Sequence, residues 1–120
     1  MVSHFPSPAQ DYQQTGIDLN EVLIKDRANT FVLRVYGDSM EGAGIYDQDE
    51  IIVDRSIKPR TGKVVVASLD GEFTVKRLGV DREGKGWLLP ANSKYPPIPV
   101  SAESDFSIFG VVTYCLHRPI

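Results

Sequence analysis

Short runs of β-branched and aromatic residues, separated by turn-forming residues, dominate this sequence from residue 30 onward. Two of these runs, residues 63–69 and 72–78, are separated only by Asp70-Gly71, a residue pair that favours a tight type I′ hairpin turn. Further runs span residues 30–36, 50–54, 87–89 and 107–116. The prolines between the last two keep that stretch out of the centre of a sheet. We therefore predict a mainly β fold of short strands, either a sandwich or a barrel-like domain.

The N-terminal part of the chain has a different character. Residues 1–16 are rich in proline and glutamine and offer little to bury, so we predict a flexible arm there. Asp18 and Glu21 have the spacing of a helix N-cap and its capping-box acid. Leu19, Val22 and Leu23 then follow at helical spacing and predict a short amphipathic helix that ends near residues 25–27. Residues 17–120 are predicted to form one domain.

Charge and composition exclude several function classes. The chain has 13 Lys and Arg against 16 Asp and Glu, a net charge of −3. A protein that neutralises nucleic-acid phosphates usually carries a basic patch, so we expect no direct sequence-specific DNA binding. The single cysteine, Cys115, excludes an internal disulfide and fits a reducing compartment. No apolar run approaches the ~20 residues that span a membrane, and no signal peptide is evident. We expect a cytoplasmic protein that does not enter the membrane.

Three motifs resemble ligand sites but are better explained by structure. Residues 79–85 match the start of a P-loop, but they lack its terminal Ser or Thr and link two predicted strands, so we predict a hairpin loop. Cys115 and His117 are too few for a structural zinc site, which needs four ligands, and are interpreted as a packed thiol and a surface histidine. The acidic residues Asp47, Asp49 and Glu50 lack the spacing of a calcium loop and predict a solvated turn. No cofactor or metal ion is expected.

Two residues stand out as candidates for chemistry. Ser39 lies in Gly37-Asp38-Ser39-Met40, directly after a predicted strand, where it could present its hydroxyl and nearby backbone N–H groups at a sheet edge. A serine in a turn is common, so this feature alone is weak.

The second candidate is a lysine in a strand. Period 2 places Lys76 on the same face as Thr74 and Leu78, while Phe73, Val75 and Arg77 share the other face. Both faces are partly apolar, so one cation lies near apolar surface. Either the stem of Lys76 is covered while its ammonium reaches water, or the amine is desolvated. In the second case its pKa falls and it becomes a usable base, and Ser-Lys is a known variant of the catalytic triad.

These residues belong to a longer pattern that resembles the LexA and UmuD family of Ser-Lys self-cleaving peptidases. The matching segments include Gly37–Met40, the run from Gly71 to Leu78 and the spacing between Ser39 and Lys76. The similarity continues through Leu89-Pro90-Ala91-Asn92-Ser93 and the strand at Phe109-Gly110-Val111-Val112. It covers nearly the whole chain.

The resemblance assigns roles within the site. It implies that Ser39 is the nucleophile and Lys76 the general base. The backbone N–H groups of Asp38 and Ser39 would then be the oxyanion donors, a contribution that is often large in acyl transfer.

The front of the chain, Phe5–Ala9 and Ile17–Asn20, is closer to the UmuD-type members. This implies an accessory subunit of a Y-family error-prone translesion DNA polymerase (polymerase V-like), acting in the SOS response to DNA damage. The resemblance also implies a homodimer and a relation to the RecA filament. We expect dimerisation through residues 108–116, because this last apolar strand has no turn partner after it and a free sheet edge invites pairing.

The chain also departs from the family. UmuD-type members carry a Cys-Gly or Ala-Gly bond before the Phe5–Ala9 segment, whereas this place reads Ser3-His4. Ala43-Gly44 aligns with the active-site loop and is not that bond. The chain therefore resembles the shortened, processed form, and we expect that it keeps an assembled site but does not cut itself, which leaves cleavage of a longer partner in trans open.

Two other functions use the same residues. The chain could be the dimerising peptidase half of a LexA-like or phage repressor, and the Phe5–Pro8 segment is what favours the polymerase subunit. A signal-peptidase-like function ranks last, because that class resembles a membrane-anchored protein and no anchor is seen here.

Overall fold

The computed structural model describes residues 16–119 and shows a mainly β fold, as the sequence predicted. Its strands are β1 (Thr30–Arg34), β2 (Glu50–Asp54), β3 (Val64–Leu69), β4 (Glu72–Val80), β5 (Gly86–Leu89), β6 (Ile98–Val100) and β7 (Phe106–Leu116). The helical elements are α2 (Leu19–Leu23) and the 3₁₀ turns η1 (Arg27–Asn29) and η2 (Glu41–Ala43). The predicted arm lies outside the described residues except for Gly16, and so does the Ser3-His4 position.

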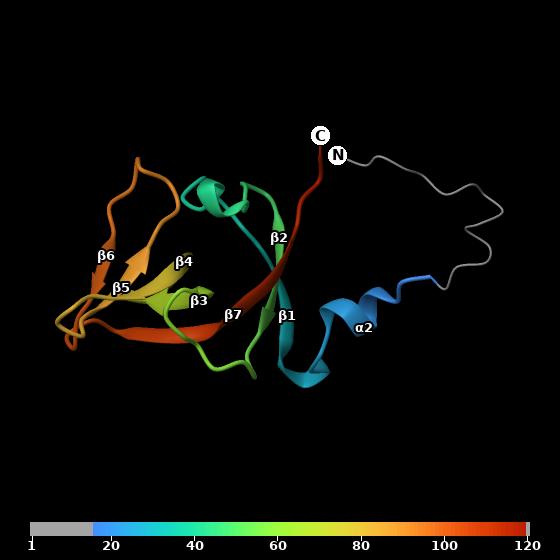
Figure 1. Ribbon diagram of the computed structural model, residues 1–120, viewed down its shortest axis with the longest axis horizontal. Coiled ribbons are helices and arrows are strands. Elements are labelled where there is room, and N and C mark those ends of the chain that lie inside the picture. The colour runs from blue at the N-terminus through green and yellow to red at the C-terminus, as the bar shows by residue number, and fades with distance from the viewer. Residues whose placement is uncertain (1–15, 120) are drawn as a thin grey trace.

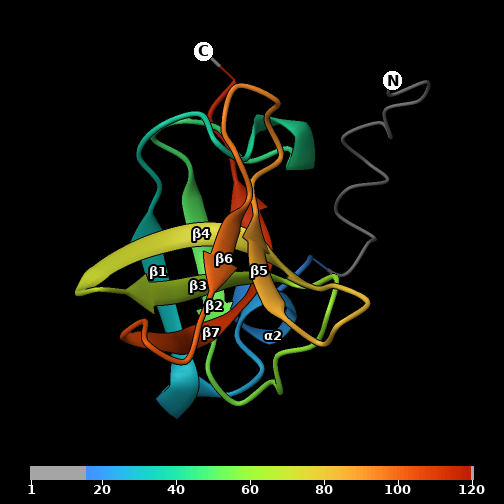
Figure 2. The ribbon, with the colours of Figure 1, turned by 90° about the vertical axis from the view of Figure 1, so that its left-hand side faces the viewer.

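Within residues 16–119, the seven strands form one antiparallel sheet in the order β1-β2-β7-β3-β4-β5-β6 (Figure 1). The long strand β7 joins its two halves, since it pairs with β3 through residues 106–111 and with β2 through residues 111–116. The register shifts between Ile52 and Val53 in one pairing and between Val66 and Ala67 in the other. Such bulges bend a sheet, and Figure 2 shows β1 and β2 crossing behind β3 and β4.

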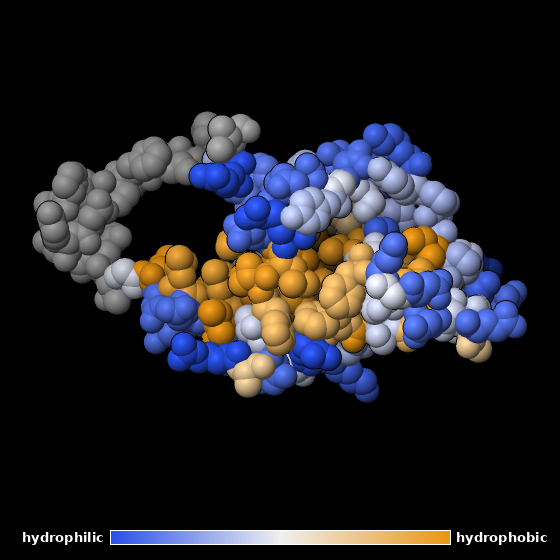
Figure 3. Space-filling view, turned by 180° about the vertical axis from the view of Figure 1, so that it is seen from behind, coloured by the Kyte–Doolittle hydropathy of each residue, from blue (hydrophilic) through white to orange (hydrophobic). Residues whose placement is uncertain are grey.

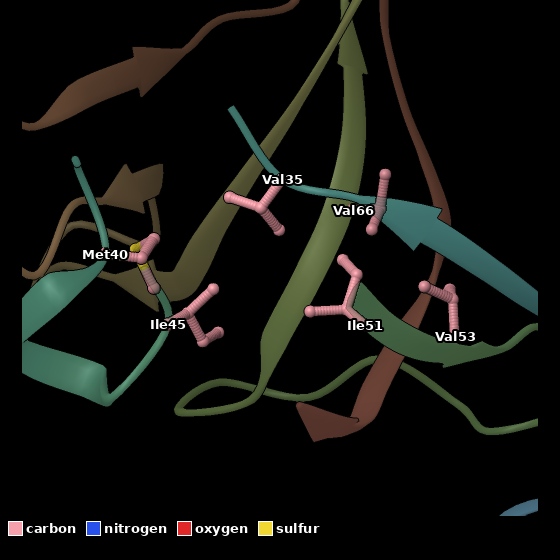
Figure 4. Packing of buried hydrophobic residues seen from close by; sticks show 6 residues of the cluster. All are labelled: Val35, Met40, Ile45, Ile51, Val53 and Val66. Carbon is pink, nitrogen blue, oxygen red and sulfur yellow. The ribbon is translucent and has the colours of Figure 1, made fainter. Parts of the chain in front are cut away.

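The bent sheet encloses a small apolar core. Val35, Met40, Ile45, Ile51, Val53 and Val66 pack together in its interior (Figure 4). Ile51 and Val53 come from β2, Val66 comes from β3, and Met40 belongs to the segment that follows β1. The core therefore ties the loop after β1 to the centre of the sheet.

The turns follow the sequence signals closely. Asp70 and Gly71 both have positive φ, at 51° and 87°, as a type I′ turn requires. The P-loop-like segment is the connection between β4 and β5, where Asp81 accepts hydrogen bonds from the backbone N–H groups of Glu83 and Lys85. This confirms the hairpin interpretation of residues 79–85.

The structure differs from the predicted secondary structure in three places. The helix ends at Leu23 rather than near residues 25–27, because Ile24 is already extended and so short a helix without a buried residue has little to stabilise it. Asp18 caps it through Asn20 N, at 2.9 Å. The first strand ends at Arg34, since Val35 bonds instead to Asp49 and Gln48 of the following loop. Strand β6, with Pro99, was not predicted; it lies at a sheet edge, where proline is tolerated.

Candidate active site

Ser39 lies in the irregular segment between β1 and η2. Gly37 has φ +93°, which lets the chain turn sharply after the strand. Its N–H donates to Asp47 Oδ1 at 2.7 Å. On the other side of Ser39, Met40 is 1% exposed and anchors the segment in the core. Ser39 therefore lies between a turn that is fixed by the Gly37–Asp47 hydrogen bond and the buried side chain of Met40.

Lys76 reaches Ser39 from the middle of β4. Its Nζ lies 3.0 Å from Ser39 Oγ, 2.6 Å from Thr74 Oγ1 and 3.0 Å from the carbonyl oxygen of Val75. The residue is only 8% exposed. Of the two interpretations of this lysine, the structure therefore selects the desolvated one, while Arg77 reaches the carbonyl oxygen of Gly62 on the exposed side.

Burial is the cause that lowers the pKa of Lys76 below its ordinary value of 10.5. In the part of the chain that the structure describes, no carboxylate forms a salt bridge with this amine. An ammonium in such a place loses its hydration without gaining a counter-ion, so the protonation equilibrium shifts towards the neutral form. A neutral amine has the lone pair that a general base needs.

The amine and the hydroxyl lie where two hollows meet. One hollow, of about 420 Å³, lies between β1 and β4 and has mostly apolar walls, including Leu33, Val66 and Val75. The second, of about 340 Å³, extends towards Tyr95 and Ile98, and Ser39 and Lys76 line both. The two hollows suit an extended, apolar chain that passes over Ser39. Elsewhere on the molecule, Figure 3 shows apolar surface gathered along the middle of the face opposite to that of Figure 1.

The two backbone N–H groups singled out from the sequence are free to bind such a chain. Within residues 16–119, neither Asp38 N nor Ser39 N donates a hydrogen bond to the protein. Their neighbouring carbonyl groups, in contrast, are held: Asn92 Nδ2 donates to Asp38 O at 2.9 Å and Ala91 N donates to Ser39 O at 2.8 Å. The structure thus brings Asp38, Ser39 and Lys76 together at one place.

The side chain of Asp38 is held by the loop between β5 and β6. The hydroxyl of Tyr95 donates to its Oδ1, and Lys94 Nζ lies 2.9 Å from its Oδ2. These contacts, with Tyr95 first and Lys94 second, hold the pKa of Asp38 below its usual 3.8. The same bond raises the pKa of the Tyr95 phenol.

Sequence reasoning missed the contributions of Thr74, Asn92 and Tyr95. Period 2 had already placed Thr74 on the face of Lys76, which was a usable signal. Asn92 falls in a segment noted only for its family resemblance, and Tyr95 carried no signal of its own. The contacts of these two with Asp38 join positions 54 and 57 residues apart.

Asp49 corrects a sequence prediction. It was expected in a solvated turn, but it is 2% exposed, and its carboxylate bonds Tyr46 N at 2.8 Å, His117 Nδ1 at 2.6 Å and Cys115 Sγ at 3.2 Å. Burial pushes the pKa of Asp49 upward, but these hydrogen bonds outweigh it and the pKa lies below 3.8. Burial and the same carboxylate raise the pKa of Cys115 to about 12.

Cys115 packs against the core, which confirms the packed thiol, and the side chain of His117 is half exposed. Across residues 16–119, no group of three or more His, Cys, Asp or Glu side chains is arranged to hold a metal ion. The three residues therefore form a structural contact between the last strand and the turn before β2.

Comparison with known proteins places the chain among peptidases. The Peptidase S24-like family profile matches residues 4–113. The chain is 44% identical to protein SamA of Salmonella typhimurium over 114 residues, which is 95% of this chain and 78% of SamA. It is 43% identical to protein ImpA of Escherichia coli, over 95% of this chain and 77% of ImpA. Its 42% identity to the LexA repressor of Xylella fastidiosa covers 89% of this chain but 53% of LexA. No helix among the described residues is long and apolar enough to cross a membrane.

Proposed function

The chain belongs to the Peptidase S24-like family, and on that premise we propose that it is a serine peptidase whose nucleophile is Ser39 and whose general base is Lys76. The observation that carries this proposal is the 3.0 Å contact between Lys76 Nζ and Ser39 Oγ, made by a lysine that is 8% exposed. Family membership supports the class of reaction, and the contact supports the choice of residues.

Lys76 Nζ has three hydrogen-bond partners, which suit the three donors of an ammonium; in the neutral amine that the proposed reaction requires, the contact with Ser39 reverses its direction. Such an amine has two N–H donors and one lone pair. The carbonyl oxygen of Val75 accepts from one N–H and Thr74 Oγ1 accepts from the other, which leaves the lone pair to accept the hydroxyl proton of Ser39. In this assignment, Thr74 and Val75 orient the base.

The reaction then proceeds by acyl transfer. Lys76 Nζ takes the hydroxyl proton as Ser39 Oγ attacks the carbonyl carbon of the scissile peptide bond. The N–H groups of Asp38 and Ser39 receive the developing oxyanion. Lys76 passes its proton to the leaving amine as the C–N bond breaks, which leaves an ester on Ser39. Water, deprotonated by Lys76, hydrolyses this ester and regenerates the hydroxyl.

The cleft favours a substrate segment of small and apolar residues. The family resemblance names Cys-Gly or Ala-Gly as the bond, and the larger hollow beside Ser39 has mainly apolar walls. A residue without a Cβ lets the backbone approach the nucleophile closely. We propose that the protein cuts such a bond in the arm of a longer partner.

The test is cleavage in trans. We expect the protein to cut a peptide carrying an Ala-Gly bond between apolar residues, and the rate to rise with pH to a midpoint below 10.5, because burial lowers the pKa of Lys76. Product would be followed by mass spectrometry. A Ser39→Ala variant is the blank; equal product from the blank and the wild-type protein would contradict the proposal.

For the biological role, we propose an accessory subunit of a Y-family translesion polymerase that acts in the cytoplasm, in the response to DNA damage and together with the RecA filament. The resemblance of the N-terminal segments to UmuD-type members supports this role. The alternative, the peptidase half of a repressor, is supported by the similarity to LexA. Co-purification with a polymerase encoded by the adjacent gene would favour the first, whereas a DNA-binding domain on the native chain would favour the second.

We also propose a homodimer, although the reason given from the sequence needs revision. Strand β7 is not an edge strand, since β2 and β3 lie on either side of it. Its pairing with β3 ends at Val111, however, so among the described strands only β2 pairs with residues 112–116. Tyr114 and Leu116 in this segment are 43% and 45% exposed. Two copies can pair their free edges about a two-fold axis.

Light scattering at tens of micromolar protein is expected to give twice the chain mass of 13.3 kDa. Lysine in place of the exposed Tyr114 puts a charge on this edge and should weaken the dimer, whereas lysine in place of the exposed Val80 of β4 should not. A mass of 13.3 kDa for the wild-type protein would contradict the proposal.

A further inference from the structure

The nucleophile segment is fixed by a loop from the far end of the sheet. Ala91 N donates to Ser39 O at 2.8 Å, and Gly42 N donates to Ala91 O at 2.7 Å. The two segments are so close that a Cβ on Gly42 would lie 2.6 Å from Ala91 O. Asn92 Nδ2 adds the bond to Asp38 O at 2.9 Å. The loop between β5 and β6 thus donates hydrogen bonds to the carbonyl groups of both Asp38 and Ser39.

Holding the Asp38 carbonyl also sets the direction of the next N–H group. The C=O of Asp38 and the N–H of Ser39 belong to one planar trans peptide, in which they point in opposite directions. Because Asn92 draws the carbonyl oxygen towards the β5–β6 loop, the Ser39 N–H points away from that loop. Within residues 16–119 this N–H has no acceptor, as an oxyanion donor requires.

Asn92 is itself rigidly held. Its Oδ1 accepts from Lys94 N at 3.0 Å, and its carbonyl oxygen accepts from Tyr95 N at 3.1 Å. These bonds fix the orientation of the side-chain amide, since a flipped amide would set its oxygen against the carbonyl of Asp38. The Tyr95 hydroxyl and Lys94 Nζ then hold the carboxylate of the same aspartate.

We propose that Asn92 is a positioning residue of the active site: by bonding Asp38 O, its side chain sets the Ser39 N–H in the direction that stabilises the oxyanion. This inference rests on the proposed peptidase function. Asn92 touches neither Ser39 Oγ nor Lys76 Nζ in the structure, so it acts through the peptide group. Tyr95 supports it by holding the Asp38 side chain.

The test uses Asn92→Asp, which keeps the shape and the acceptor for Lys94 N but loses the donor to Asp38 O. Removing an oxyanion donor costs about 10²–10³-fold in kcat, so misdirecting one is expected to lower kcat by roughly 10–100-fold with KM nearly unchanged. Tyr95→Phe, which leaves the Asn92 bond in place, should have a smaller effect. Asn20→Asp, the same change at an exposed position in α2, is the matched control.

A second measurement separates positioning from a purely structural role. Residual dipolar couplings of isotope-labelled protein report the direction of each N–H bond. We expect the Ser39 coupling to change in Asn92→Asp and to stay unchanged in Asn20→Asp. A lower melting temperature with unchanged kcat and an unchanged Ser39 coupling would overturn the inference. If the wild-type protein cleaves the peptide no faster than Ser39→Ala does, the proposed function is overturned instead. The residual dipolar coupling of the Ser39 N–H would still show whether Asn92 sets its direction.

Discussion

Replacement of Lys76 by methionine is expected to abolish peptide cleavage while the protein stays folded. Methionine keeps an unbranched apolar stem in the buried position but has no basic nitrogen. General-base catalysis contributes about 10²–10⁴-fold, so we expect kcat to fall at least that far, towards the level of Ser39→Ala. Lys58→Met makes the same change at an exposed lysine outside the cleft and is expected to keep full activity.

The same variant predicts a change in the pH dependence of stability. In the unfolded chain Lys76 titrates at its ordinary pKa of 10.5, and burial lowers this pKa in the folded state. The unfolded state therefore binds more protons between the two values, and the free energy of unfolding falls as the pH drops from 10.5 through the folded-state pKa. Lys76→Met lacks this contribution, so its stability should be flatter with pH and no lower at neutral pH.

Urea unfolding at a series of pH values, together with peptide cleavage, measures both effects. Substantial cleavage by Lys76→Met would contradict the role of Lys76 as the base. A Lys76 pKa at the ordinary lysine value, measured by NMR on the labelled side chain, would contradict its desolvation in solution.

The second large effect is expected from the core, where Ile51→Ala should destabilise the fold by about 2–5 kcal/mol. Ile51 is 0% exposed and packs inside the buried cluster, where Val53, Val66 and Ile45 are its labelled neighbours in Figure 4. Truncation leaves a cavity that this tightly packed cluster fills only in part. Since domains of this size are stable by only about 5–15 kcal/mol, the loss is a large part of the total.

Ile57→Ala is the matched control for this prediction, because Ile57 is 37% exposed and loses less on truncation. We expect it to cost less than about 1 kcal/mol. The free energies come from urea unfolding curves. Equal losses for the two variants would show that Ile51 does not lie at the centre of the core. A wall of the cleft beside Ser39 also includes Ile51, so activity is expected to fall together with stability.

Local sequence rules predicted most of the strands, because they depend on residues near one another. Asp70-Gly71 specified its hairpin through the positive φ values that these two residues tolerate. Period 2 placed Thr74 and Lys76 on one face of β4, which is the face that the structure turns towards Ser39. The family pattern supplied the pairing of Ser39 with Lys76, which no local rule could give.

The errors share a cause. Asp49 lies among acidic residues that suggest a solvent-exposed turn. The pairing of β7 with β2 instead brings Cys115 and His117 to its carboxylate. The short helix lost its last turn because it buries no side chain. The last strand was predicted to have a free edge along its length, but β3 pairs with residues 106–111, so among the described strands this side is free only over residues 112–116. Each of these outcomes depends on which segments, distant in the sequence, pack against the residue or strand in the folded protein.

By itself, then, the sequence determined the alternation of strand and turn, the faces of β4 and the chemical types available to the site. The tertiary structure alone decided that Lys76 is buried while Arg77 is only half-buried, and that the loop carrying Asn92 reaches the peptide of Asp38 and Ser39. The physical reason is the range of the forces. Backbone preferences and side-chain periodicity act over a few residues, whereas the desolvation of an amine and the direction of a single N–H are set by groups that a bent sheet brings together from remote parts of the chain.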